Sequence, residues 1–126
     1  MTRAGARGLA IAMMLGLTGA GCSGAVDSPA RTVPSGDPEH GLEVMNRVGC
    51  GSCHAIPGIA WPEGQVGPSL EGMGRRALIG SGLPNRPETL IPYLVDAPSV
   101  DEGSPMPPMP ITEEEARDIA AYLYGL

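Results

Sequence analysis

The segment CGSCH places Cys50 and Cys53 three residues apart, with His54 directly after the second cysteine. In a turn of helix, side chains at positions i and i+3 point to the same side. Both sulfurs could therefore hold one planar group, and the imidazole could lie beneath it. This is the arrangement of covalent haem attachment, in which the two cysteines form thioethers with the haem vinyl groups and the histidine supplies an axial nitrogen.

Two other chemistries use paired cysteines at this spacing. A thioredoxin-like dithiol needs a βαβ context, and the sequence contains no strand pattern. A zinc site needs a second pair of ligands, but outside CGSCH the only further histidine is His40 and the only further cysteine is Cys22. Attachment of one haem c is therefore the favoured interpretation.

A second unusual segment is SPMPPMP, residues 104–110, which sets Met106 and Met109 among four prolines. Proline fixes φ and removes a backbone donor, so this run can be neither a helix interior nor a central strand. The sequence predicts a stiff, extended loop that carries two thioethers.

Three helices joined by glycine- and proline-rich loops are predicted, so the fold class is all-α. The first helix starts at Asp37, a favourable N-cap, and Pro38, which suits a first turn, and it ends before Gly49. Its predicted apolar face contains Leu42, Met45 and Val48. This helix leads directly into CGSCH.

A middle helix is predicted over 87–95, where Pro92 either kinks the helix or lies in the first turn of a shorter one begun at Thr89. The last helix starts with a capping box formed by Thr112 and Glu115. Its apolar residues recur at helical spacing, as Ala116, Ile119, Ala120 and Leu123. This helix follows the SPMPPMP loop.

The composition leaves such a domain short of core residues. The 126-residue chain has no Phe, one Trp and three Tyr, while its 19 Gly and 14 Pro favour loops. Three cysteines, two of them so close together, cannot build a disulfide framework. A large apolar cofactor such as haem could fill the core. The sequence has no phosphate loop and no basic patch, and its net charge of -6 gives no reason to expect nucleic-acid binding.

The N-terminal residues 1–21 have the features of a secretory signal peptide. Arg3 and Arg7 precede an uncharged apolar run that is too short to span a bilayer as a permanent helix. The run ends at LTGAGC, where small residues precede Cys22 as they do in bacterial lipoprotein signals. Cys22 would then be lipidated and would anchor the chain to a membrane, whereas plain cleavage after Ala20 or Ala25 is the alternative.

Residues 22–36 have almost nothing to bury and are predicted to form a flexible tether. The folded domain is predicted to cover residues 37–126. We expect this domain on the periplasmic side of the membrane, either soluble or lipid-anchored.

After the tether, the sequence resembles the small class I cytochromes c of bacterial respiratory chains. The resemblance is carried by CGSCH, by Gly41 and Met45 four apart on the preceding helix, and by the Gly-Pro-Ser-Leu segment at residues 67–70. It implies the class I cytochrome c fold, with three main helices and Gly/Pro-rich loops wrapped around one covalently attached haem c.

The resemblance implies roles for three residues outside CGSCH. The Pro68 carbonyl would receive the other ring N–H of His54 and fix the orientation of this ligand. Arg76, with Arg75 as the alternative, would bond a haem propionate, unless it is simply a solvated surface charge. Tyr93 stands where the family usually has a tryptophan near the propionates, and it could donate one hydrogen bond there.

The family also places a methionine before the C-terminal helix as the second axial ligand. Residues three apart in an extended run return to the same side, so geometry alone excludes neither Met106 nor Met109. Met106 is favoured because Met109 lies only three residues before Thr112, which leaves little chain between the iron and the helix start. A soft, neutral thioether favours Fe(II), so ligation by His54 and Met106 would raise the reduction potential.

The function expected is one-electron transfer, with an oxidase, a dehydrogenase or another cytochrome as redox partner. The alternative is a haem enzyme or gas sensor in which the methionine departs from the iron. Without Arg3 and Arg7, six of the eight basic residues remain against fourteen acidic ones, and the chain has no lysine. Docking is therefore expected to be mainly apolar, or to involve a basic partner.

Overall fold

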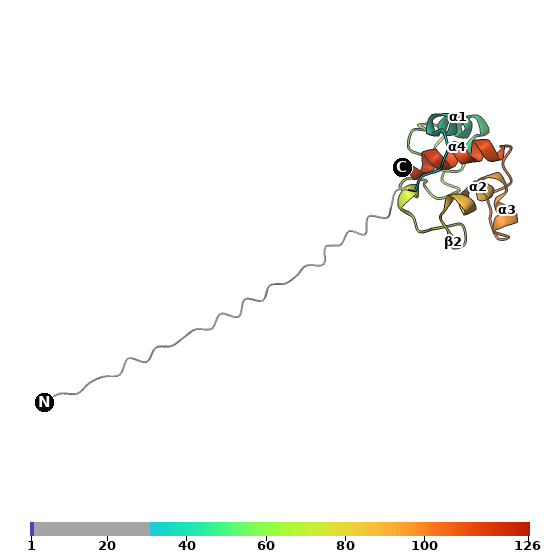
Figure 1. The fold of residues 1–126 in the computed structure, drawn as a ribbon. Helices are drawn as coiled ribbons and strands as arrows, with labels where there is room; N and C mark the ends of the chain where they lie inside the picture. The colour runs from blue at the N-terminus through green and yellow to red at the C-terminus, as the bar shows by residue number, and fades with distance from the viewer. Residues whose placement is uncertain (2–30) are drawn as a thin grey trace.

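The structure is a computed structural model that describes residue 1 and residues 31–126 (Figure 1). The elements in this part of the chain are α1 (Pro38–Val48), η1 (Cys50–Ser52), η2 (Met73–Arg75), β1 (Leu78–Ile79), β2 (Leu83–Pro84), α2 (Pro87–Val95), α3 (Ala97–Val100) and α4 (Glu113–Tyr124). The predicted cleavage sites and Cys22 lie outside the described residues. None of the described helices is long and apolar enough to cross a membrane.

The first and last helices, α1 and α4, pack directly against each other (Figure 1). Their closest approach is at Gly41, where an added Cβ would lie only 2.2 Å from the Asp118 carbonyl oxygen. Val44 and Met45 follow on the same side of α1, and each is 1% exposed. A glycine is therefore required at this crossing, which fixes the helix that leads into CGSCH.

The ends of both helices are formed by the residues that the sequence indicated. The Asp37 carboxylate accepts hydrogen bonds from two backbone N–H groups of the first turn of α1, and Gly49 ends this helix with a φ of 80°. At α4, the Thr112 N–H donates to the Glu115 carboxylate (2.8 Å), and the Glu115 N–H donates to the Thr112 hydroxyl (3.1 Å). The predicted apolar residues of α4 are all buried: Ala116, Ile119, Ala120 and Leu123.

The middle helix α2 has the predicted bounds, and Pro92 lies inside it. The helix begins at Pro87, so the shorter alternative that starts at Thr89 is not the one observed. Leu90 and Ile91 are its buried residues. The helix stops at Val95 and is followed at once by the four-residue α3, which the sequence did not predict.

The sequence also did not predict a small antiparallel hairpin. Strands β1 and β2 pair Leu78 with Pro84 and Ile79 with Leu83. Each strand has only two residues, which is too short for an alternating pattern to be recognised. The hairpin stands beside a mainly helical fold, so the all-α class remains the correct description.

The described part of the predicted tether, residues 31–36, lies against the domain. The Arg31 guanidinium lies 5.9 Å from the centre of the Tyr124 ring and donates a hydrogen bond to the Gly74 carbonyl. Val33 packs against the core, and an added Cβ at Gly36 would lie 2.7 Å from the Ala121 side chain. The ordered contacts therefore begin at least six residues before Asp37, and the remainder of the predicted tether lies outside the described residues.

Candidate haem site

CGSCH forms a tight turn directly after α1. The left-handed backbone of Gly49 redirects the chain into η1, and the N–H groups of Cys53 and His54 both donate to the Cys50 carbonyl, at 3.2 and 3.1 Å. Both cysteines are free thiols, with Cys50 half-buried and Cys53 exposed. Burial raises the pKa of the Cys50 thiol above its ordinary value. Two cysteine side chains and an imidazole thus lie within one turn.

The His54 ring is held by the loop that follows it. Its Nδ1 lies 2.7 Å from the Pro68 carbonyl oxygen, which is the hydrogen bond that the sequence comparison implied. An added Cβ at Gly67 would lie 2.3 Å from Cε1 of the ring, so only glycine leaves room for the imidazole. Since Nδ1–H is the donor to Pro68, the neutral ring presents Nε2 as a lone-pair donor. The tautomer and the packing fit an axial iron ligand.

Backbone hydrogen bonds fasten the same loop to the CGSCH turn. The Gly64 N–H donates to the Gly51 carbonyl (2.8 Å), and the Gly67 N–H donates to the Cys53 carbonyl (2.8 Å). Two large apolar side chains of this loop, Trp61 and Val66, are 85% and 87% exposed. The loop therefore covers the turn with its backbone and presents apolar groups outward.

Arg76 contacts the main chain of this loop. Its Nη2 donates to the carbonyls of Ser69 and Glu71, the latter at 3.0 Å, and the side chain is half-buried. The neighbouring Arg75 is exposed, and although its backbone N–H donates to the Gly72 carbonyl (3.0 Å), its side chain makes no hydrogen bond to another described residue. Arg76 is thus more than a solvated charge, although a bond from its remaining nitrogens to a propionate stays a prediction.

Tyr93, on α2, contacts the loop of residues 104–110 that carries Met106 and Met109. Its hydroxyl lies 2.9 Å from the Ser104 hydroxyl, and the Ser104 oxygen also accepts the Met106 N–H at 3.3 Å. Ser104 was missed at the sequence level, where only its place at the start of a proline-rich loop could have pointed to it. Tyr93 and Ser104 together hold the backbone at Met106.

The backbone of Met109 is bonded to the end of α2 and not to Ser104. Its N–H donates to the Val95 carbonyl at the end of α2 (2.9 Å), and its carbonyl accepts the Ile111 N–H (2.8 Å). Both methionine side chains are half-buried. The structure therefore gives two groups of predicted site residues, one around His54 with Pro68, and one around Met106 with Tyr93.

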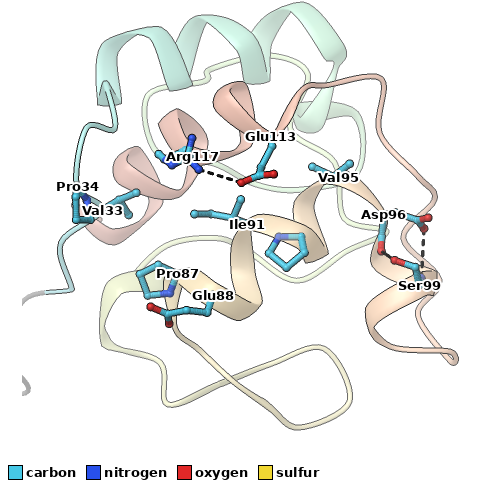
Figure 2. Close-up of a pocket in the computed structure, with 11 residues that line it drawn as sticks. Val33, Pro34, Pro87, Glu88, Ile91, Val95, Asp96, Ser99, Glu113 and Arg117 are labelled. Atoms are coloured by element: carbon cyan, nitrogen blue, oxygen red, sulfur yellow. Dashed lines mark hydrogen bonds and ion pairs between the residues drawn. The ribbon is translucent and has the colours of Figure 1, made fainter.

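A large open groove lies elsewhere, with a volume of about 690 Å³ (Figure 2). It is formed by Val33 and Pro34 together with residues of α2, α3 and α4. An ion pair between Arg117 and Glu113 (3.0 Å) lies on its wall, as the dashed line in Figure 2 shows. None of the predicted haem residues lines this groove.

Comparison with known proteins finds similarity to cytochromes. No protein-family model matches the chain. The chain is 31% identical over 107 residues to cytochrome c oxidase subunit 2 of Alkalihalophilus pseudofirmus, which covers 84% of this chain but 29% of that subunit. It is 29% identical over 87 residues to cytochrome c-551 of Ectopseudomonas mendocina, which covers 68% of this chain and 96% of that protein.

Among solved structures, cytochrome c2 of Paracoccus denitrificans matches with a TM-score of 0.51 and 22% identity, over 70% of this chain and 93% of that one. This match confirms the predicted class I cytochrome c fold. Together with the cytochrome c-551 relative, it supports a class I c-type cytochrome. The match to the oxidase subunit covers less than a third of that protein.

Proposed function

We propose that this chain is a mono-haem electron carrier in which Cys50 and Cys53 attach one haem c, and His54 and Met106 are its axial ligands. The observation that carries this proposal is the His54 ring, held by the Pro68 carbonyl at 2.7 Å in one turn with two free thiols. When bound, haem c supplies an iron that exchanges one electron between Fe(III) and Fe(II).

The protein's part in electron transfer is to hold both axial side chains still. The Pro68 carbonyl fixes the donor nitrogen of His54, and the prolines beside Met106 limit the motion of the thioether. If His54 and Met106 both hold the iron, they would leave no site for oxygen or peroxide, and the haem would supply one-electron transfer alone. The chain is accordingly an electron-transfer protein and not an enzyme.

Redox proteins are the partners that this chemistry requires. The relative named as an oxidase subunit supports donation to a terminal oxidase of a bacterial respiratory chain, with a dehydrogenase or another cytochrome as the electron source. The signal-like residues 1–21 support export to the periplasmic side. Cys22 would provide a lipid anchor there, and residues between Cys22 and Arg31 would link the anchor to the domain.

The proposal is tested on the exported holoprotein by visible spectroscopy and a denaturing gel. We expect haem to stay with the denatured chain, and the reduced protein to bind almost no carbon monoxide. In Cys53→Ala, most covalent haem should be lost because one thioether cannot form. Wild type with full carbon monoxide binding would favour a haem enzyme or gas sensor, and a normal yield of covalent haem in Cys53→Ala would refute the attachment site.

A further inference from the structure

A buried asparagine holds the segment that carries the two neighbouring arginines. Asn85 is 1% exposed, and its side-chain amide donates to the carbonyls of Met73 and Arg76, both at 2.9 Å. Its backbone N–H donates to the Ala77 carbonyl at 2.9 Å. The Asn85 side-chain oxygen accepts from the Tyr124 hydroxyl at 3.1 Å. The N–H groups of Asn85 therefore fix three carbonyls of residues 73–77, and its side-chain oxygen is held by Tyr124.

The Tyr124 hydroxyl, which donates to the Asn85 side chain, remains a donor at neutral pH. Burial raises the pKa of Tyr124 to about 12, so its hydroxyl stays protonated at neutral pH. A buried amide with all its hydrogen bonds satisfied defines one arrangement of its partners, because any other would leave polar groups unpaired. Asn85 thus sets the backbone position of Arg76 from within the core.

The Arg76 side chain extends this constraint to the loop behind His54. Its Nη2 donates to the carbonyls of Ser69 and Glu71. Ser69 directly follows Pro68, whose carbonyl accepts the His54 Nδ1–H at 2.7 Å. Each peptide unit is planar, so once the Ser69 carbonyl is fixed, the adjacent unit that carries the Pro68 carbonyl can move only through φ and ψ of Ser69.

We propose that Arg76 and Asn85 are positioning residues that keep the Pro68 carbonyl aligned with the His54 imidazole. This inference rests on the proposed function, in which His54 is an iron ligand. A carbonyl that accepts the second ring N–H makes the ligand more basic, and a more basic ligand favours Fe(III). Disturbing the alignment should therefore raise the reduction potential and expose the Nδ1–H to solvent exchange.

The direction in which the reduction potential changes distinguishes this positioning role from a purely electrostatic one. A positive charge near the iron favours Fe(II), so loss of that charge alone lowers the reduction potential. Arg75 provides the matched control, since it has the same charge, directly precedes Arg76 in the chain, and its side chain makes no hydrogen bond to another described residue. Replacing either arginine by lysine keeps the charge, but only at Arg76 does it remove a guanidinium that joins two carbonyls.

The test compares Arg76→Lys, Arg75→Lys and Asn85→Ala in purified ferrous holoprotein. We measure the reduction potential and, by proton NMR, the exchange of the His54 Nδ1–H with deuterated water. Arg76→Lys and Asn85→Ala should raise the potential and speed this exchange by roughly fivefold or more, as for loss of one hydrogen bond. Arg75→Lys should change neither quantity.

Asn85→Ala leaves buried carbonyls without donors and can fail to fold, but the two lysine variants test the proposal without it. If Arg76→Lys matches wild type in both measurements, or if Arg76→Gln merely lowers the potential as Arg75→Gln does, Arg76 acts through its charge and the positioning role is wrong. A wild type without covalent haem, or with a His54 that does not ligate iron, would instead overturn the proposed function.

Discussion

Two methionines three residues apart are held by different parts of the molecule. The Met106 N–H is bonded to Ser104, whose hydroxyl contacts Tyr93, while the Met109 N–H is bonded to Val95. The prolines between them prevent a simple exchange of place. Of the two, only Met106 is held through a side chain, Tyr93, that the family resemblance predicts to lie near the haem.

Replacement of each methionine by leucine distinguishes their roles. Met106→Leu should remove the sulfur-to-iron absorption band at the red end of the ferric spectrum, lower the reduction potential and open the iron to carbon monoxide. Met109→Leu is the matched control, with the same change three residues away, and should keep the band. The reverse pattern would assign the ligand to Met109, and retention of the band in both variants would exclude methionine ligation.

At the residue scale, the sequence predicted the part of the site that a short motif or the family resemblance covers. CGSCH is a local motif, whereas the contact between His54 and Pro68 joins residues 14 apart and was implied by the family resemblance. The contacts of Asn85 and the bond between Tyr93 and Ser104 join residues 9 to 39 positions apart. No periodicity records such pairs, so these contacts required the structure.

At the scale of elements, the crossing of α1 and α4 depends on the absence of a side chain at Gly41. In Gly41→Ala, the new Cβ would meet the Asp118 carbonyl, and the helices would have to separate. We expect a loss of about 1–3 kcal/mol in the free energy of unfolding, measured by denaturant titration of holoprotein. Gly103→Ala, where no atom lies within 4 Å of the added Cβ, should change it by less than about 0.5 kcal/mol. Equal effects of the two changes would contradict this account.

An ionic contact joins the same two helices. His40 Nδ1 lies 2.7 Å from one Asp118 oxygen, and the other oxygen accepts the Asp37 N–H at 2.8 Å. The hydrogen bond to Asp118 raises the pKa of His40 above 6.5. For Asp118, burial acts to raise the pKa, but the hydrogen bonds from Asp37 and His40 outweigh it and leave the pKa below 3.8.

These shifts predict how stability depends on pH. The His40 contribution is fully present below pH 6.5, the unfolded pKa, and is lost as the pH rises through the higher folded value. The Asp118 contribution is present above pH 3.8 and is lost as the pH falls through the lower folded value. Wild-type holoprotein should therefore lose stability in denaturant titrations as the pH rises from 6.5 through the raised folded pKa of His40. His40→Gln should show a flatter dependence there, and an unchanged slope would show that this pair does not contribute.

The helices could be predicted because caps and apolar spacing agree within each one. Thr112 with Glu115, and Asp37 with Pro38, are local signals that act independently of the rest of the fold. The two-residue strands and α3 have no such signal, and their conformation depends on partners such as Asp101, whose carboxylate accepts the Ser81 N–H (2.7 Å) and hydroxyl (2.8 Å). These short elements could not be predicted because contacts with distant residues, and not local sequence signals, determine their conformation.

At the scale of the whole molecule, the shortage of aromatic residues makes the domain depend on its cofactor. With no Phe and one Trp in the chain, haem would supply much of the apolar volume between the helices and loops. We expect apoprotein, made as a Cys50→Ala, Cys53→Ala double variant, to show little helical circular dichroism and no cooperative thermal transition. Holoprotein melted under the same conditions is the control. A native-like melt of apoprotein would show that the polypeptide core is sufficient.

The absence of lysine and the exposed apolar side chains limit which kinds of redox partner can dock with the domain. The chain has no lysine, and Trp61 and Val66 stand exposed on the loop fastened to CGSCH. Electron transfer to a basic partner should slow as salt rises, whereas an apolar docking surface gives rates that are nearly independent of salt. Stopped-flow measurements across ionic strengths distinguish these cases. Faster reduction at low salt by an acidic partner would contradict both.

The contact of Arg31 with Tyr124 brings the start of the described domain beside the end of its last helix (Figure 1). A domain whose two ends meet can be spliced into a host polypeptide at one point, because the host chain enters and leaves at the same place. The same geometry permits circular permutation through a short linker between residue 31 and the end of α4. The Arg31 contact thus makes the domain a transferable unit, which suits a match that spans 29% of a much longer relative.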